Sequence, residues 1–213
     1  MYGLYVITER WQGRGHADVV RAALAGGARA IQLRDKETCV RELVGTALEL
    51  RRLCAEAGAT FIVNDRLDVA LAAQADGVHL GPEDMRVASA RQALRGMERQ
   101  RFLIGASVST VEEARQAVAE GADYLGVGSI FATETKPDAG EAVGPQRLAE
   151  IRHAVSLPLV AVGGITADNA AEAIRAGAGG VAVISAVSRA DDMEAAVRRL
   201  VAVVEETRHA RKK

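Results

Sequence analysis

The sequence lacks the features that mark membrane-spanning, secreted and nucleic-acid-binding proteins. No apolar stretch reaches the roughly 18 residues of a transmembrane helix, and the first residues show neither a basic leader followed by an apolar segment nor a small-residue cleavage site. The 27 basic and 28 acidic residues leave a net charge of −1, so no long-range field attracts nucleic acid or an anionic membrane. Only Arg208 to Lys213 form a basic run, which we expect to be a solvated, frayed tail. These absences predict a cytoplasmic protein that binds neither nucleic acid nor a membrane.

Cysteine is also scarce. Cys39 and Cys54 fall in one predicted helix and are too far apart along its axis to form a disulfide. This favours a reduced, cytosolic protein. No stretch rich in glycine or proline marks a linker, so we expect a single domain over residues 1–213.

Eight apolar runs alternate with stretches that have helical hydrophobic spacing, and glycine or polar residues lie at or near the end of each run. Parallel strands that alternate with helices need crossover connections, which this spacing provides. The pattern predicts an α/β fold, a single-domain (β/α)₈ TIM barrel, with its site at the carboxyl ends of the strands. The predicted strand runs are Gly3–Thr8, Ala30–Asp35, Thr60–Asp65, Gly77–Gly81, Phe102–Val108, Tyr124–Phe131, Leu157–Ile165 and Gly180–Val187.

The second run carries a polar row. Its period of two places Gln32, Arg34 and Lys36 on one side, and Ile31 and Leu33 on the other. Unpaired cations are costly in a parallel barrel, where both faces of each strand are covered. Arg34 and Lys36 are therefore predicted to meet anions at the barrel mouth, with an internal salt bridge as the alternative.

The third and fourth runs each bring a carboxylate to the same rim. Asp65 and Asp84 could be ordinary helix N-caps, but two carboxylates beside a basic cluster suit an oxygen-liganded Mg²⁺ shared with a phosphate group. His79 lies within a strand, and we interpret it as a packed or hydrogen-bonded histidine.

Phosphate chemistry is also predicted after the sixth, seventh and eighth runs. Thr133, Thr135 and Lys136 lie in the longest polar loop and offer donors to phosphate oxygens; the alternative is an ordinary surface loop. The pair Gly163-Gly164 and the turn at Ser185 would let backbone amides approach a phosphate between the last two strands.

Together and in this order, the residues named above and the stretches around them resemble the thiamine-phosphate synthase family over nearly the whole barrel. The sequence departs from the family pattern at Pro82, Ser109, Ser129 and Gly179, where glutamine, histidine, proline and aspartate are usual. The matching stretches are Tyr5–Thr8, Gln32–Lys36, Asn64–Arg66, Ala75–Gly81, Glu83–Asp84, Gly105–Ser107, Gly121–Tyr124, Thr133–Lys136, Gly163–Ile165 and Ile184–Ser185.

The resemblance implies a transferase of thiamine biosynthesis that joins hydroxymethylpyrimidine diphosphate to hydroxyethylthiazole phosphate, with Mg²⁺ as cofactor. By the same likeness, Gln32 and Ser107 contact the pyrimidine, and Asp65 and Asp84 hold the metal. The implied diphosphate ligands are Arg34, Lys36, Asn64 and Lys136, and the implied thiazole-phosphate ligands are Thr133, Thr135, Gly164, Ile184 and Ser185. Arg34, Lys36, Lys136 and Ser107 are the implied catalytic residues.

Two other functions fit the same scaffold. A thiazole tautomerase needs the phosphate cup of the last two strands but no diphosphate site, and related tautomerases use a histidine in the stretch that holds Ser109 here. The residues retained for a diphosphate and metal site argue against it: Arg34, Lys36, Asp65, Asp84 and Lys136. A phosphate-ligand sensor without catalysis is the third possibility, because a fold alone does not fix function. The sequence leaves open a homo-oligomer.

Overall fold

The computed structural model describes residues 3–96, 102–133, 135 and 141–211, which fold into eight strands and nine helices. The strands are β1 (Leu4–Ile7), β2 (Ala30–Leu33), β3 (Thr60–Asn64), β4 (Gly77–Leu80), β5 (Leu103–Val108), β6 (Tyr124–Val127), β7 (Leu159–Val162) and β8 (Gly180–Val183). The helices are α1 (His16–Ala25), α2 (Val40–Glu56), α3 (Leu67–Ala72), α4 (Val87–Ala93), α5 (Val111–Glu120), α6 (Gly144–Ala154), α7 (Ala170–Arg175), α8 (Ser185–Ser188) and α9 (Met193–Arg211).

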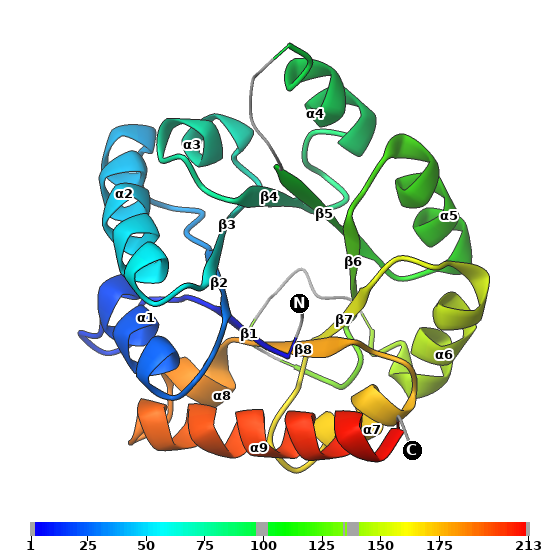
Figure 1. The fold of residues 1–213 in the computed structure, drawn as a ribbon. Helices are drawn as coiled ribbons and strands as arrows, with labels where there is room; N and C mark the ends of the chain where they lie inside the picture. Colours follow the sequence, from blue (N-terminus) through cyan, green and yellow to red (C-terminus); the bar gives the residue numbers. More distant parts are fainter. Residues whose placement is uncertain (1–2, 97–101, 134, 136–140, 212–213) are drawn as a thin grey trace.

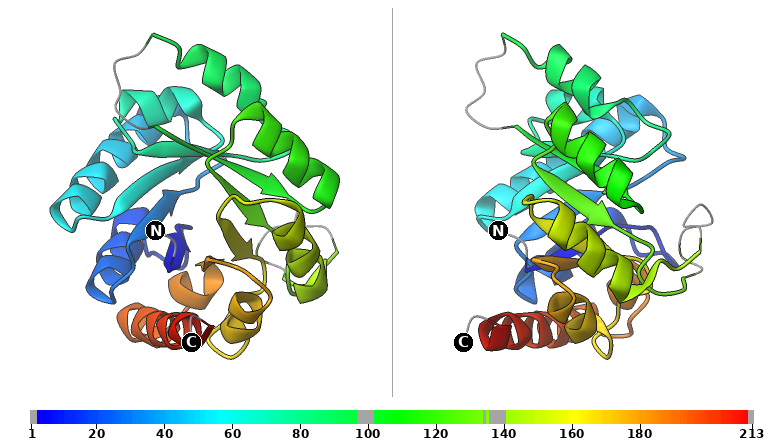
Figure 2. Two further views of the ribbon diagram at one scale, coloured as in Figure 1. Left: turned by 45° about the vertical axis from the view of Figure 1, so that its right-hand side comes forward. Right: turned by 90° about the vertical axis from the view of Figure 1, so that its right-hand side faces the viewer.

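The strands close into one parallel barrel in sequence order, and β1 pairs with β8 to complete the ring. The helices surround this ring (Figure 1), and the turned views show them packed along the outside of the strands (Figure 2). The predicted (β/α)₈ barrel is therefore confirmed. Every predicted run contains its strand, but the last three runs extend well past it. Strand β6 ends at Val127, β7 at Val162 and β8 at Val183, and α8 begins at Ser185. The apolar pattern continues there because α8 is also buried, with Val187 0% exposed.

Apolar side chains form two separate clusters on the two faces of the barrel wall. The outward residues, such as Ile31 and Leu33 of β2, pack against the helices, as the alternation in this strand predicts. A smaller cluster fills the barrel interior and includes Tyr5, Leu103 and Tyr124. The interior is a packed core, so only the ends of the barrel are open to a ligand.

The chain end is better ordered than the sequence suggests. Helix α9 continues to Arg211, whose guanidinium donates to the carbonyls of Ile174 at 2.8 Å and Ala178 at 3.3 Å. Arg208 donates to Glu205 at 2.7 Å. The expectation of a frayed tail is wrong up to Arg211, because these cations find acceptors on their own helix and near α7.

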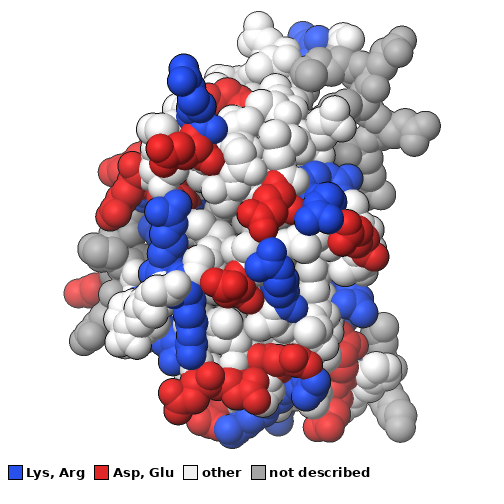
Figure 3. Space-filling model, turned by 90° about the vertical axis from the view of Figure 1, so that its left-hand side faces the viewer, with Lys and Arg blue, Asp and Glu red and all other residues white. Residues whose placement is uncertain are grey.

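The two cysteines belong to α2, with Cys39 at its N-cap position. Cys39 and Cys54 are both free, and Cys54 is buried in α2. Acidic and basic side chains alternate over the face that carries α1 and α2 (Figure 3), and Arg21 of α1 pairs with Glu49 of α2 at 3.0 Å. Among the described helices, none is both long and apolar enough to cross a bilayer.

Candidate active site

A cavity of about 800 Å³ opens at the carboxyl ends of the strands. Its walls come from the ends of β3 and β5 to β8 and from the loops that follow β2 to β8. Residues that are far apart in sequence therefore meet at one rim. This is the end of the barrel where the sequence predicts the site.

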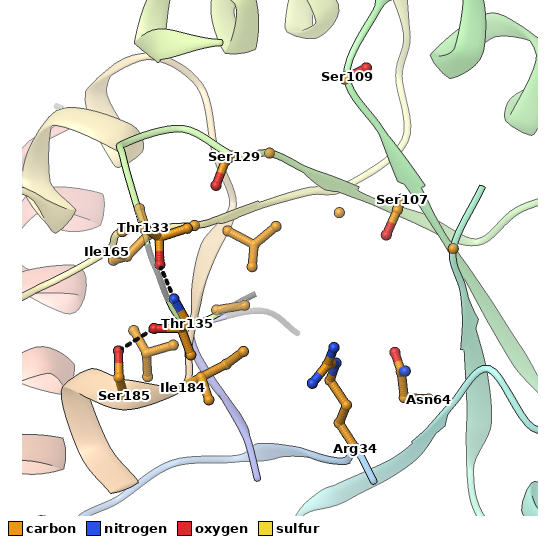
Figure 4. Close-up of a pocket in the computed structure, with 18 of the residues that line it drawn as sticks. Arg34, Asn64, Ser107, Ser109, Ser129, Thr133, Thr135, Ile165, Ile184 and Ser185 are labelled. Atoms are coloured by element: carbon orange, nitrogen blue, oxygen red, sulfur yellow. Dashed lines mark hydrogen bonds between the residues drawn. The ribbon is translucent and has the colours of Figure 1, made fainter. Parts of the chain in front are cut away.

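One side of the cavity is basic. Arg34 and Lys36 follow β2 and Asn64 ends β3, and all three line the cavity. Figure 4 shows the guanidinium of Arg34 extended into the cavity with the amide of Asn64 beside it. The backbone of Arg34 is held by the side chain of Thr8, which accepts its N–H at 3.3 Å.

Two carboxylates lie next to this basic side. Asp65 and Asp84 line the same cavity and are close enough for their side chains to share a hydrogen bond. Burial, followed by the neighbouring Asp84, raises the pKa of Asp65 well above its ordinary value. Neither residue is an N-cap, because the caps of α3 and α4 are Arg66 and Arg86. The N-cap alternative is therefore wrong for both.

The carboxylate pair fits a divalent cation. Two half-buried carboxylates repel each other when both are ionised, and a cation between them removes that cost. Their oxygen atoms are the ligands that Mg²⁺ prefers, and Mg²⁺ usually completes its shell with water and substrate phosphate. Among the described residues no cluster of three or more histidine, cysteine or acidic side chains offers a metal site. A site with two protein carboxylates therefore depends on the substrate for further ligands.

Hydroxyl groups and glycines form the opposite side. The side chains of Thr135 and Ser185 are 2.9 Å apart, and the hydroxyl of Thr133 accepts the backbone N–H of Thr135 at 3.2 Å (Figure 4). Gly163 and Gly164 both have positive φ, and a Cβ on either would lie within 3 Å of neighbouring atoms. Glycine is thus required here by backbone conformation and by space. Ile184 and Gly164 also line this half of the cavity.

A chain of hydrogen bonds crosses the barrel interior and ends at the cavity. The amide of Gln32 donates to the hydroxyl of Tyr5 at 3.0 Å, which is 3.1 Å from the hydroxyl of Tyr124. His79 then links Tyr124, at 3.1 Å, to the hydroxyl of Ser107, at 2.9 Å. The prediction that His79 is hydrogen-bonded is confirmed. Gln32 is 2% exposed and reaches the cavity only through this chain, so its contact with a substrate stays a prediction.

Glu113 and Arg189 also line the cavity and were not predicted. Glu113 accepts hydrogen bonds from the backbone and side chain of Ser109, and its spacing from Thr110 is a capping-box signal that could have placed it at the start of α5. Arg189 pairs with Glu9 at 2.9 Å, and its guanidinium lies 4.0 Å from the ring centroid of Trp11. No local pattern marks Arg189, because both partners lie near the other end of the chain.

Comparison with known proteins agrees with this geometry. The family model described as thiamine monophosphate synthase matches residues 4–187. The chain belongs to this family. It is 55% identical over 209 residues to a thiamine-phosphate synthase of Moorella thermoacetica, covering 97% of this chain and 98% of the relative. It is 56% identical over 201 residues to one of Methanoculleus marisnigri, covering 93% of each.

A solved structure supports both the fold and the family. Thiamine phosphate pyrophosphorylase from Pyrococcus furiosus superposes with a TM-score of 0.88 at 46% identity, covering 96% of both chains. The family and these relatives do not favour a thiazole tautomerase.

The positions that depart from the usual family pattern lie partly within the cavity. Pro82, Ser109 and Ser129 line the cavity, so each of these departures places a different side chain in the cavity wall. Gly179 precedes β8, where its N–H donates to the carbonyl of Leu159 at 2.8 Å. Lys136, the predicted third cation of this family's site, lies outside the described residues, and its role stays a prediction.

Proposed function

We propose that the protein is a thiamine-phosphate synthase that joins a pyrimidine diphosphate to a thiazole phosphate. The carbon–oxygen bond between the pyrimidine methylene and the diphosphate breaks, and the diphosphate leaves with the electron pair. The lone pair of the thiazole nitrogen forms the new carbon–nitrogen bond. The products are thiamine phosphate and pyrophosphate. No proton has to be removed from the nucleophile, so no Ser-His-Asp arrangement is required.

One observation carries the proposal: a single cavity has two sides of different chemistry, one with basic side chains and one with hydroxyl groups. The side with Arg34 and Lys36 suits a group that carries several negative charges, such as a diphosphate. The side with Thr133, Thr135 and Ser185 offers hydroxyl donors and suits a phosphate monoester. A reaction between two phosphorylated substrates needs both sides.

The basic side would stabilise the leaving group. Negative charge grows on the diphosphate as the bond breaks, and interactions that strengthen with this charge lower the barrier. The proposed catalytic cations are Arg34 and Lys36, together with Lys136, which is proposed from the sequence alone. Asn64 would add a neutral hydrogen bond to the diphosphate.

Asp65 and Asp84 are the proposed Mg²⁺ ligands. When bound, Mg²⁺ would supply positive charge beside the diphosphate oxygens. The two carboxylates would orient the diphosphate through the cation, and their shared position at one rim supports this assignment.

The remaining predicted residues would hold the two heterocycles. The hydroxyl of Ser107 is held by His79 inside the barrel and would be a fixed partner for the pyrimidine. Gln32, at the other end of the same series of hydrogen bonds, would bind the pyrimidine with it. Gly164 and Ile184 would complete the thiazole-phosphate side with the hydroxyl residues. Oligomeric state and cytoplasmic location stay predictions.

An assay with both phosphorylated heterocycles tests the proposal. We expect thiamine phosphate, detected by fluorescence after oxidation, only when protein, Mg²⁺ and both substrates are present. Product without one of the substrates, or none in the complete mixture, would refute the proposal. Binding of both substrates without turnover would instead favour a sensor.

Arg34→Lys tests the basic side within this assay. A lysine cannot reproduce the paired hydrogen bonds of a guanidinium, and loss of one charge-assisted hydrogen bond corresponds to a roughly ten- to hundredfold lower kcat. Arg29→Lys is the matched control, because Arg29 is exposed at the opposite end of the same strand. Equal rates in the two variants would remove Arg34 from the mechanism.

A further inference from the structure

A buried histidine lies behind the basic side of the cavity. His16 is the first residue of α1, is 4% exposed, and is not among the residues that line the cavity. Both nitrogen atoms of its ring have partners on elements other than α1. Such a buried polar ring, bonded on both sides, fixes the positions of the groups that it joins.

The first partner of His16 is Thr8, which follows β1. The ring Nδ1 lies 2.8 Å from the Thr8 hydroxyl oxygen, and Thr8 is 0% exposed. The same oxygen accepts the backbone N–H of Arg34 at 3.3 Å. Thr8 therefore connects the histidine ring to the backbone of a residue whose side chain lines the cavity.

The second partner is Asp35, the next residue in the loop after β2. The ring Nε2 lies 3.1 Å from Asp35 Oδ2. The Asp35 carboxylate also accepts the backbone N–H groups of Glu37 and Thr38, each at 3.0 Å, and the Thr38 hydroxyl at 2.7 Å. Arg10 adds an ion pair at 3.2 Å. The Asp35 carboxylate thus holds together the turn that precedes and follows Lys36.

For a neutral His16 ring, a single arrangement of protons satisfies these contacts. An ionised carboxylate only accepts, so Nε2 must carry the proton that it donates to Asp35. In neutral His16, Nδ1 then accepts from the Thr8 hydroxyl, while the Thr8 oxygen accepts from Arg34. Burial lowers the pKa of His16, against the opposing effect of Asp35, and favours this neutral form.

We propose that His16 is a positioning residue for the diphosphate side of the cavity. Through Thr8 and Asp35 it fixes the loop that presents Arg34 and Lys36. The Asp35 side chain is bonded to His16, and the side chains of its two neighbours in sequence, Arg34 and Lys36, line the cavity. This inference rests on the proposed function only in taking the anion on this side to be a diphosphate.

Pyrophosphate binding in the presence of Mg²⁺ tests the role of His16 without turnover. We expect His16→Ala to weaken pyrophosphate binding, measured by calorimetry, by about ten- to hundredfold, because small displacements of positioning groups have effects of this size. In the synthase assay, the KM for the pyrimidine diphosphate should rise while the KM for the thiazole phosphate stays unchanged. If His16 only stabilised the fold, its removal would not change one KM value and leave the other unchanged.

Two conservative variants test the geometry. A glutamine side chain places its amide near the position of Nε2, whereas an asparagine reaches only about as far as Nδ1. His16→Gln should keep the donor to Asp35 and restore most of the affinity, and His16→Asn should behave like His16→Ala. Equal binding by the Gln and Asn variants would overturn the assigned contact with Asp35.

Val19→Ala is the matched control for stability. Val19 is 0% exposed in the same helix, so its truncation destabilises α1 without touching the loop after β2. Weakening of pyrophosphate binding by Val19→Ala equal to that of His16→Ala would overturn the proposal, as would unchanged binding in His16→Ala. If the wild-type protein makes no thiamine phosphate, the proposed function fails, while the pyrophosphate measurements still decide the role of His16.

Discussion

Asp35 shows how one side chain serves the site without entering it. It lies between Arg34 and Lys36 in sequence, but its carboxylate is bonded to α1 and to its own loop. Burial alone would raise the pKa of Asp35, but hydrogen bonds from Thr38 and Glu37 outweigh burial and hold the pKa well below its ordinary value. Sequence spacing placed the polar row of this loop correctly, because alternation is local. It could not identify His16 and Arg10 as partners of Asp35, since both come from the preceding βα unit.

The lowered pKa of Asp35 predicts a pH dependence of stability. The folded protein binds this proton less readily than the unfolded chain, so the stabilising effect is complete above the ordinary pKa of about 3.9. It is lost as the pH falls toward the lower pKa of the folded state. We therefore expect Asp35→Asn to be less stable than wild type at pH 7, and the difference in free energy of unfolding, measured with urea, to shrink between about pH 5 and 3.

Asp168→Asn is the control for this measurement. The Asp168 side chain is 80% exposed in a surface pair with Arg199, and exposed pairs contribute little to stability. Its stability difference from wild type should be small at every pH. A constant difference for Asp35→Asn over the same range would contradict the account of Asp35.

At the scale of the elements, strand β5 leaves room for the side chains of His79 and Tyr124 in the barrel interior. A Cβ on Gly105 would lie 2.2 Å from Cζ of Tyr124 and 2.5 Å from Nδ1 of His79. Glycine at this point therefore leaves the space in which His79 and Tyr124 meet. The same strand, two residues later, presents Ser107 to the cavity.

Gly105→Ala is expected to destabilise the protein by about 1–3 kcal/mol, because the added methyl group overpacks the interior. The midpoint of thermal unfolding should fall, and the KM for the pyrimidine diphosphate should rise as Ser107 loses its fixed partner. Gly45→Ala is the matched control: it lies in α2 with open space around the new methyl group, and should stabilise the protein by roughly 0.5–1 kcal/mol. A Gly105→Ala variant as stable as wild type would contradict this packing.

The sequence predicted strands better than it predicted contacts between them. Hydrophobic spacing identified all eight strands, and the change to helix at Ser185 was obscured because Ala186 and Val187 of α8 continue the apolar run. The partners of the His79 ring could not be predicted, since Tyr124 and Ser107 lie on later strands with no fixed spacing from it. Arg189 was missed for the same reason, as its partners Glu9 and Trp11 adjoin it only when the barrel closes.

At the scale of the whole molecule, the site exists only in the closed ring. The cavity draws on residues from β2 to β8, and the pairing of β1 with β8 completes the barrel that holds them together. An unfolded chain cannot gather these groups, so pyrophosphate and Mg²⁺ should bind the folded state alone. Ligand binding should therefore stabilise the entire barrel and not one loop.

Pyrophosphate with Mg²⁺ is accordingly expected to raise the midpoint of thermal unfolding. At a ligand concentration of about 100 times Kd the stabilisation is about 2.7 kcal/mol, which corresponds to a rise of about 5–10 °C for a chain of this size. Addition of a chelator should abolish most of the rise, because the carboxylates of Asp65 and Asp84, the proposed Mg²⁺ ligands, would then repel the anion. Asp84→Ala should respond weakly to Mg²⁺, while Arg29→Lys should respond as wild type does. A full rise without Mg²⁺, or in Asp84→Ala, would show that the anion is held by the basic residues alone and would remove the metal from this site.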